Sequence, residues 1–78
     1  MRELLLRYMK TGENGVIVRV KSRGELGRRI RDMGLIPGAA VHMEGRAPLK
    51  DPVAVRLRDF TLTLRNNEAD AIEVKVED

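Results

Sequence analysis

The sequence predicts a mainly β fold, a small and partly open antiparallel barrel with one helix plugging one end. Three observations lead to this prediction. Apolar and polar side chains alternate in five short segments, which is typical of half-buried strands. One segment, at about residues 23–33, instead has helical spacing, with Leu26, Ile30 and Met33 in a single apolar stripe. Turn-forming residues separate the segments, and a chain of 78 residues has room for one core.

The first strand is expected at residues 16–21. Ile17 is expected on its outer, partly covered face, while the inner face carries alternate valines, Val16, Val18 and Val20. The apolar stretch before it, residues 1–11, is expected to form either a short leading strand or a turn. Because Ser22 is followed three residues later by Glu25, the helix is expected to begin in a capping box.

A forced turn is expected to follow the helix. Gly34 stands where a helix most often ends in a left-handed residue. Pro37 then fixes φ and Gly38 is free to take a positive φ, which is the chemistry of a type II turn. We therefore interpret Gly34, Pro37 and Gly38 as residues that shape the turn.

Three further strands should follow, the last two joined as a hairpin through a tight turn at Asp59. Their inner faces are expected to carry the alternating apolar residues Ala39, Val41, Met43, Val53, Val55, Leu57, Phe60, Leu62 and Leu64. Residues 66–71 read as one helical turn, with Asn66 as its N-cap. The final strand is expected to point Ile72, Val74 and Val76 inward.

The composition argues against catalysis. The chain has no cysteine, so it has no disulfide, thiolate ligand or cysteine nucleophile. The lone histidine, His42, falls on an outer strand face, and capping accounts for the lone serine, Ser22. No phosphate-binding glycine loop occurs. We therefore expect no enzyme, no catalytic residue, no cofactor and no metal site, and the absence of a long apolar run suggests a cytoplasmic protein.

The charge is unevenly distributed along the chain. Residues 19–31 carry a local charge of +5, whereas residues 66–78 carry −4 within a net charge of +3. A basic face indicates an acidic partner, a phosphate surface or an anionic membrane, although a solvated helix face is the simpler interpretation. A small basic barrel that binds nucleic acid is the alternative to a protein-interaction module. The scarcity of aromatic residues, Tyr8 and Phe60, argues against base stacking.

Three ordered motifs resemble the FeoA family of bacterial ferrous iron transport accessory proteins. They are IRDMGLIPG at residues 30–38, RAPLKDP at residues 46–52 and LRNNEADAIEV at residues 64–74. The resemblance implies an SH3-like β-barrel with a helical insertion, with residues 1–78 forming a single domain. Two positions depart from the family pattern, in that Lys50 and Asp59 stand where glycine is common. Lys50 is expected to make its loop less tightly turned or more basic, and Asp59 is expected to preserve the hairpin.

The resemblance also implies a role. The family's members act in ferrous iron uptake without catalysis, and the expected partner is the cytoplasmic G-protein region of the FeoB membrane transporter. The chain would then lie at the inner face of the inner membrane through that partner; self-association is left open, and direct iron binding is a weaker idea. Leu35 and Leu49 are expected to be exposed apolar anchors because both lie in turns. The predicted partner-binding residues are Arg28, Arg29, Arg31, Leu35, Arg46, Pro48 and Leu49.

Overall fold

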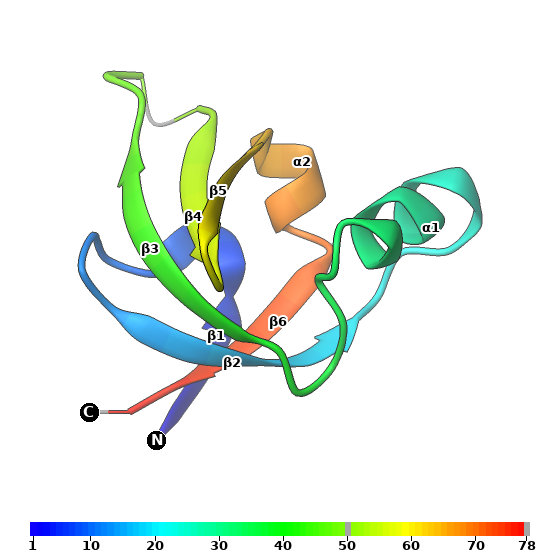
Figure 1. Ribbon diagram of the computed structural model, residues 1–78, viewed down its shortest axis with the longest axis horizontal. Coiled ribbons are helices and arrows are strands. Elements are labelled where there is room, and N and C mark those ends of the chain that lie inside the picture. The colour runs from blue at the N-terminus through cyan, green and yellow to red at the C-terminus, as the bar shows by residue number, and fades with distance from the viewer. Residues whose placement is uncertain (50, 78) are drawn as a thin grey trace.

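An antiparallel sheet of six strands curls around the core in a computed structural model that describes residues 1–49 and 51–77 (Figure 1). The strand order is β1-β6-β2-β3-β4-β5. The strands are β1 (Arg2–Leu5), β2 (Asn14–Val20), β3 (Ala40–Arg46), β4 (Val53–Leu57), β5 (Phe60–Leu64) and β6 (Ile72–Val76). The helical elements are η1 (Leu6–Tyr8), α1 (Gly24–Asp32) and α2 (Asn66–Ala69). The mainly β fold with one inserted helix and a short helical turn is confirmed.

The leading segment forms both a strand and a turn, so the two expected alternatives are combined. β1 pairs antiparallel with β6, and η1 follows it directly. This turn places Leu6 and Met9 in the core, where both are fully buried. The expectation for Lys50 lies outside the described residues.

Gly34 ends α1 as the sequence predicts. Its φ is +95°, and its N–H donates to the Arg31 carbonyl at 2.9 Å. The next N–H, that of Leu35, reaches back to the Ile30 carbonyl at 3.2 Å. These two bonds form a Schellman motif, which satisfies carbonyls that would otherwise be free at the helix end.

The turn that follows has the predicted type II form. The Ala39 N–H donates to the Ile36 carbonyl at 3.0 Å, and Gly38 has a φ of +94°. The turn is also tied to β2, because the Gly38 N–H donates to the Ile17 carbonyl at 2.8 Å. The motif therefore ends the helix, reverses the chain and aligns β3 against β2.

The predicted faces of β2 are wrong at its start. Ile17 is buried in the core, whereas Val16 is 45% exposed. The cause is a β-bulge, since the register of β2 against β6 shifts between Ile17 and Arg19. An extra residue in one strand moves its side chains to the opposite face, so simple alternation fails across the bulge.

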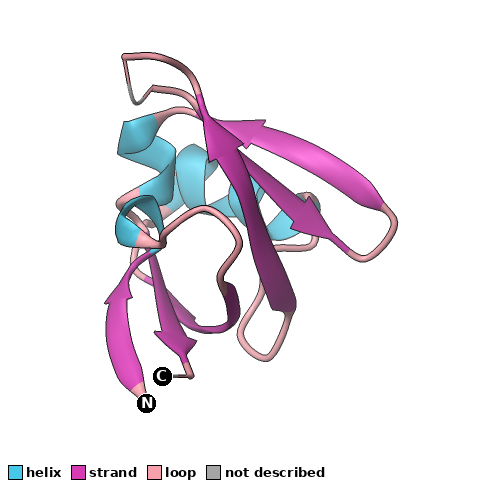
Figure 2. Cartoon of the chain, turned by 90° about the vertical axis from the view of Figure 1, so that its left-hand side faces the viewer, coloured by secondary structure: helices cyan, strands magenta, loops and turns pink. Residues whose placement is uncertain are grey.

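Phe60 was predicted to be in the core, but it is 48% exposed. β4 and β5 form the expected hairpin, which projects away from the rest of the sheet in Figure 2. Phe60 is the first residue after the two-residue loop, at the projecting end, whereas Leu64 at the other end of β5 is buried. The left-handed residue of the loop is Arg58, with a φ of +59°, and not Asp59.

The two predicted helix caps are also wrong. The residue that precedes α1 is Arg23, and no side chain caps the helix start, because the Ser22 hydroxyl turns to the Arg23 carbonyl at 3.4 Å. At α2 the N-cap is Arg65 rather than Asn66. There the N–H of Arg65 donates to Glu68 Oε1 at 2.9 Å, which is the carboxylate half of a capping box.

The core lies between the curled sheet and the helices. Ile30 of α1 is fully buried, while Leu26 and Met33 pack partly against the core, so the predicted apolar stripe is confirmed. The inward residues of β3, β4 and β6 also agree with their alternation. The buried apolar residues of these strands are Val41, Met43, Val53, Val55, Leu57, Ile72, Val74 and Val76.

Gly27→Ala should destabilise the protein, although alanine favours a helix by about 1 kcal/mol over glycine. A Cβ at Gly27 would lie 2.3 Å from the Ser22 carbonyl oxygen, so the backbone before α1 would have to move. We expect the free energy of unfolding to fall by about 1–3 kcal/mol in urea titrations. Gly45→Ala is the matched control, because a Cβ there meets no atom within 4 Å. A Gly27→Ala variant more stable than the parent would contradict this packing.

Candidate docking site

The predicted partner-binding residues do not form one surface. α1 and the loop between β3 and β4 lie at opposite ends of the view in Figure 1. Arg28 and Arg31 are exposed on α1, whereas Pro48 and Leu49 are exposed on the distant loop. Leu49 is 90% exposed, as expected for an apolar anchor in a turn. A single small contact therefore cannot include both groups.

Leu35 was predicted to be an exposed anchor, but it is fully buried. The Schellman motif explains the error, because the residue after the left-handed glycine commonly packs back against the helix. Ile36, one residue further on, is instead 47% exposed. The exposed apolar side chain of the motif is therefore Ile36.

Arg29 has a structural contact. Its Nη2 donates to Glu68 Oε2 at 2.7 Å, and this carboxylate belongs to a residue that is only 6% exposed. The other oxygen of Glu68 accepts the N–H of Arg65. The pair thus joins α1 to the start of α2, and a charge buried in this way depends on its partners.

Arg46 also acts within the fold. Its guanidinium donates to the carbonyl of Met9, so it holds the segment after η1 against the end of β3. By contrast, Arg28 and Arg31 make no ion pair with any residue in the described ranges. These two are the arginines of α1 that are free to meet a partner.

An apolar cleft of about 650 Å³ lies between the Gly34–Gly38 turn and the β4–β5 hairpin. Its exposed walls are Ile36 on the turn and Phe60 on the hairpin, both about half exposed. Sequence reasoning placed Phe60 in the core and did not single out Ile36. The other lining residues are Met33, Gly34, Pro37, Gly38, Ala39, Ala40, Leu57 and Arg58.

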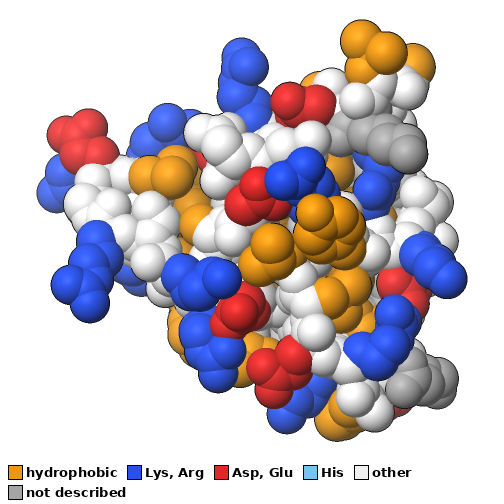
Figure 3. Space-filling view, turned by 180° about the vertical axis from the view of Figure 1, so that it is seen from behind, with side chains coloured by type: hydrophobic (Ala, Val, Ile, Leu, Met, Phe, Trp, Pro, Cys, Tyr) orange, Lys and Arg blue, Asp and Glu red, His pale blue; other side chains and the backbone are white. Residues whose placement is uncertain are grey.

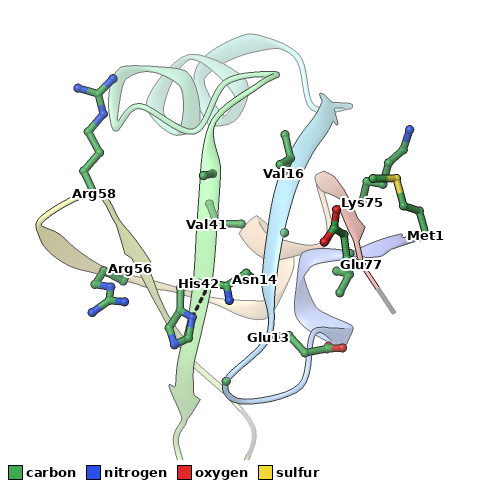
Figure 4. Close-up of a pocket in the computed structure, with 14 residues that line it drawn as sticks. Met1, Glu13, Asn14, Val16, Val41, His42, Arg56, Arg58, Lys75 and Glu77 are labelled. Carbon is green, nitrogen blue, oxygen red and sulfur yellow. Dashed lines mark hydrogen bonds between the residues drawn. The ribbon is translucent and has the colours of Figure 1, made fainter.

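A second hollow, of about 590 Å³, borders the cleft on the outer side of β2 and β3 (Figure 4). The two share Ala40 and Arg58. His42, predicted to be a surface residue, lines this hollow half-buried, and its Nδ1 lies 2.8 Å from Asn14 Oδ1. Arg56, at the same edge, has its Nε 3.4 Å from a carboxylate oxygen of Glu44.

The resolved pKa shifts belong to ion pairs outside the cleft. A side-chain hydrogen bond to Asp70 raises the pKa of Arg7, and one to Glu73 raises the pKa of Arg19. The backbone N–H of Lys10 lowers the pKa of Glu13.

Seen from behind in Figure 3, positive and negative side chains intermix around a central apolar patch. Ion pairs join strands and loops here, and neither the positive nor the negative side chains form a separate cluster on that face.

Within residues 1–49 and 51–77, no group of three or more histidine, aspartate or glutamate side chains is placed to hold a metal ion. None of the helices in these ranges is long and apolar enough to cross a membrane. The features that remain are the apolar cleft and the free arginines of α1.

Comparison with known families matches the FeoA domain to residues 4–76, nearly the whole length of the sequence. The chain belongs to the FeoA domain family. The resemblance in the three motifs is thereby confirmed. FeoA is a non-catalytic transport accessory, so membership of this family confirms the prediction that the chain is not an enzyme.

A curated FeoA relative comes from Porphyromonas gingivalis and is a fusion of Fe(2+) transport protein A with the Fe(2+) transporter FeoB. It is 41% identical over 71 residues, which cover 91% of this chain. The chain spans only 8% of the length of that relative.

Solved FeoA structures share the fold. Iron(II) transport protein A from Clostridium thermocellum has a TM-score of 0.90 and 36% identity, over 94% of this chain and 45% of that one. A FeoA-like protein from Clostridium acetobutylicum has a TM-score of 0.88 and 33% identity, over 97% and 88%. FeoA of Stenotrophomonas maltophilia, an SH3 domain protein, is 24% identical with a TM-score of 0.78, over 95% and 89%. The SH3-like barrel is therefore confirmed.

Arg29→Ala should lower the free energy of unfolding by about 1–2 kcal/mol, because it removes a charged hydrogen bond from the buried Glu68 carboxylate. Arg28→Ala, one residue earlier on α1, should change stability by less than about 0.5 kcal/mol. Urea titration of both variants measures the difference. Equal effects would show that the Arg29–Glu68 pair contributes no stability.

Stability should fall in acid partly through Glu73, whose hydrogen bond from Arg19 lowers its pKa below the ordinary value of 4.5. A lowered folded-state pKa gives stability that is present above pH 4.5 and is lost as pH falls through the folded pKa. Glu73→Gln should therefore reduce the drop in Tm from about pH 6 to about pH 3. Glu25→Gln, on the exposed start of α1, is the control, and an unchanged drop in Glu73→Gln would contradict this assignment.

Proposed function

We propose that this FeoA-domain chain is a non-enzymatic accessory of ferrous iron uptake that docks on the cytoplasmic G-protein region of a FeoB-like transporter and modulates it. The observation that carries the proposal is the Porphyromonas gingivalis relative, in which transport protein A and FeoB are one chain. Fusion holds two segments at a high effective concentration, which is useful when they act on each other. In this proposal residues 1–78 work as one domain at the inner face of the inner membrane.

The docking surface proposed is the α1 end of the molecule. Two supports come from the structure. Arg28 and Arg31 are exposed and make no ion pair with described residues, so their charges are available to an acidic surface. The half-exposed Ile36 and Phe60 lie in the adjoining cleft and offer apolar area. A contact with an apolar centre and charged neighbours is the usual composition of a protein interface.

The remaining predicted residues have other roles in this proposal. Leu35, Arg29 and Arg46 serve the fold through the contacts described above. Pro48 and Leu49 form a separate exposed tip that is available for a second, independent contact.

The double variant Arg28→Glu/Arg31→Glu should weaken binding to the full-length FeoB-like transporter in nanodiscs by at least about tenfold. Charge reversal places two carboxylates where the proposal needs cations, and the surviving affinity should depend less on salt. Biolayer interferometry at low and high salt measures both effects. Circular dichroism should show an unchanged fold, because neither side chain is buried.

Lys10→Glu, an exposed reversal away from α1, is the control and should leave the affinity unchanged. Equal affinities of parent and double variant would remove α1 from the site. A parent that ignores the transporter but shifts a labelled oligonucleotide at low salt would favour the nucleic-acid alternative.

A further inference from the structure

Arg58 has a backbone conformation that its residue type does not favour. It occupies the first position of the two-residue β4–β5 loop with a φ of +59°. Glycine, asparagine or aspartate adopts this left-handed region at lower cost than a long side chain does. The two-residue hairpin loop requires a positive φ at this position, but it does not require an arginine there, so the choice of residue leads to a functional hypothesis.

Contacts within the fold do not account for this arginine. Its guanidinium makes no hydrogen bond or ion pair with any residue of the described ranges, although Arg56 two positions earlier lies against Glu44. The side chain of Arg58 extends away from the strands at the edge of the second hollow in Figure 4. Arg58 therefore presents an unneutralised cation to solvent.

The location of Arg58 indicates what that cation could meet. Arg58 lines both the apolar cleft and the second hollow, at the point where they adjoin. On one side of it lie Ile36 and Phe60, whose exposed apolar surface would bind a large apolar side chain. A guanidinium beside such a cleft can donate two N–H groups to the two oxygens of a carboxylate in a bidentate pair.

We propose that Arg58 is a binding residue for an acidic segment of the partner, and that it pairs with a carboxylate whose neighbouring apolar side chain enters the Ile36–Phe60 cleft. The inference rests on the proposed function, since the partner is the transporter. Charge complementarity selects this occupant, because Arg58 is the charged residue among those that line the cleft and would repel a basic segment. The apolar walls make a protein segment a better fit than a bare phosphate surface.

This proposal makes stability and binding change in opposite directions in one variant. Arg58→Gly relieves the left-handed strain, so Tm should rise by about 4 °C. The same variant removes the cation, so its Kd for the full-length transporter in nanodiscs should rise about tenfold. Differential scanning calorimetry and biolayer interferometry measure the two quantities on the same sample.

Two variants act as matched controls. Arg58→Lys keeps the charge and the strain, so Tm should match the parent and binding should be largely retained. Arg56→Gln removes a nearby cation that already faces Glu44, and it should leave Kd unchanged. If the parent binds the transporter and Arg58→Gly binds equally well, this inference fails while the proposed function stands. If the parent does not bind, both the inference and the proposed function fail. If Arg58→Gly binds more weakly but also has a lowered Tm, structural damage explains the loss of binding, and the inference is overturned.

Discussion

The left-handed backbone of Gly34 is the constraint on which the rest of the structure depends. It stops α1 after Asp32, and the Schellman bonds then direct Leu35 into the core. The chain then makes a type II turn, in which the N–H of Gly38 donates to the carbonyl of Ile17 in β2. A single residue with a positive φ thus determines where α1 ends, how this helix closes one end of the barrel and where β3 starts. It also places Ile36 on one wall of the cleft, so the candidate site follows from the same constraint.

The arginines of α1 divide into structural and free residues, and this division changes how a basic helix should be interpreted. Arg29 is taken up by the buried carboxylate of Glu68, which also closes the first turn of α2. Arg28 and Arg31 make no ion pair with any of the described residues. A charge-reversal experiment on the whole helix would therefore mix loss of stability with loss of binding. Separating the residues by their contacts removes that ambiguity.

The sequence analysis predicted the features that hydrophobic periodicity and turn-forming residues determine. The extent of α1 was correct to within one residue at each end, and the inward faces of β3, β4 and β6 and the motif turn were correct. The errors occur where tertiary structure overrides a local pattern. A bulge exchanges the faces of β2 at Ile17, and distance from the core leaves Phe60 exposed at a hairpin end. Leu35 was judged by its position in a turn, yet the cap geometry directs it inward. The cleft joins two segments distant in sequence, so no local signal marks it.

The pairing of β1 with β6 brings the two ends of the described chain together, and they lie side by side in Figure 1. α1 is on the far side of that view from both ends. A polypeptide joined at either end would therefore leave the domain from the same corner. The molecule is 30 Å across its longest axis, so an extended tether of about nine residues is needed to cross it. Met1 and Glu77 at these ends line the second hollow, which adjoins the cleft at Ala40 and Arg58. A covalently attached partner with a short tether would therefore meet that hollow before it meets the cleft.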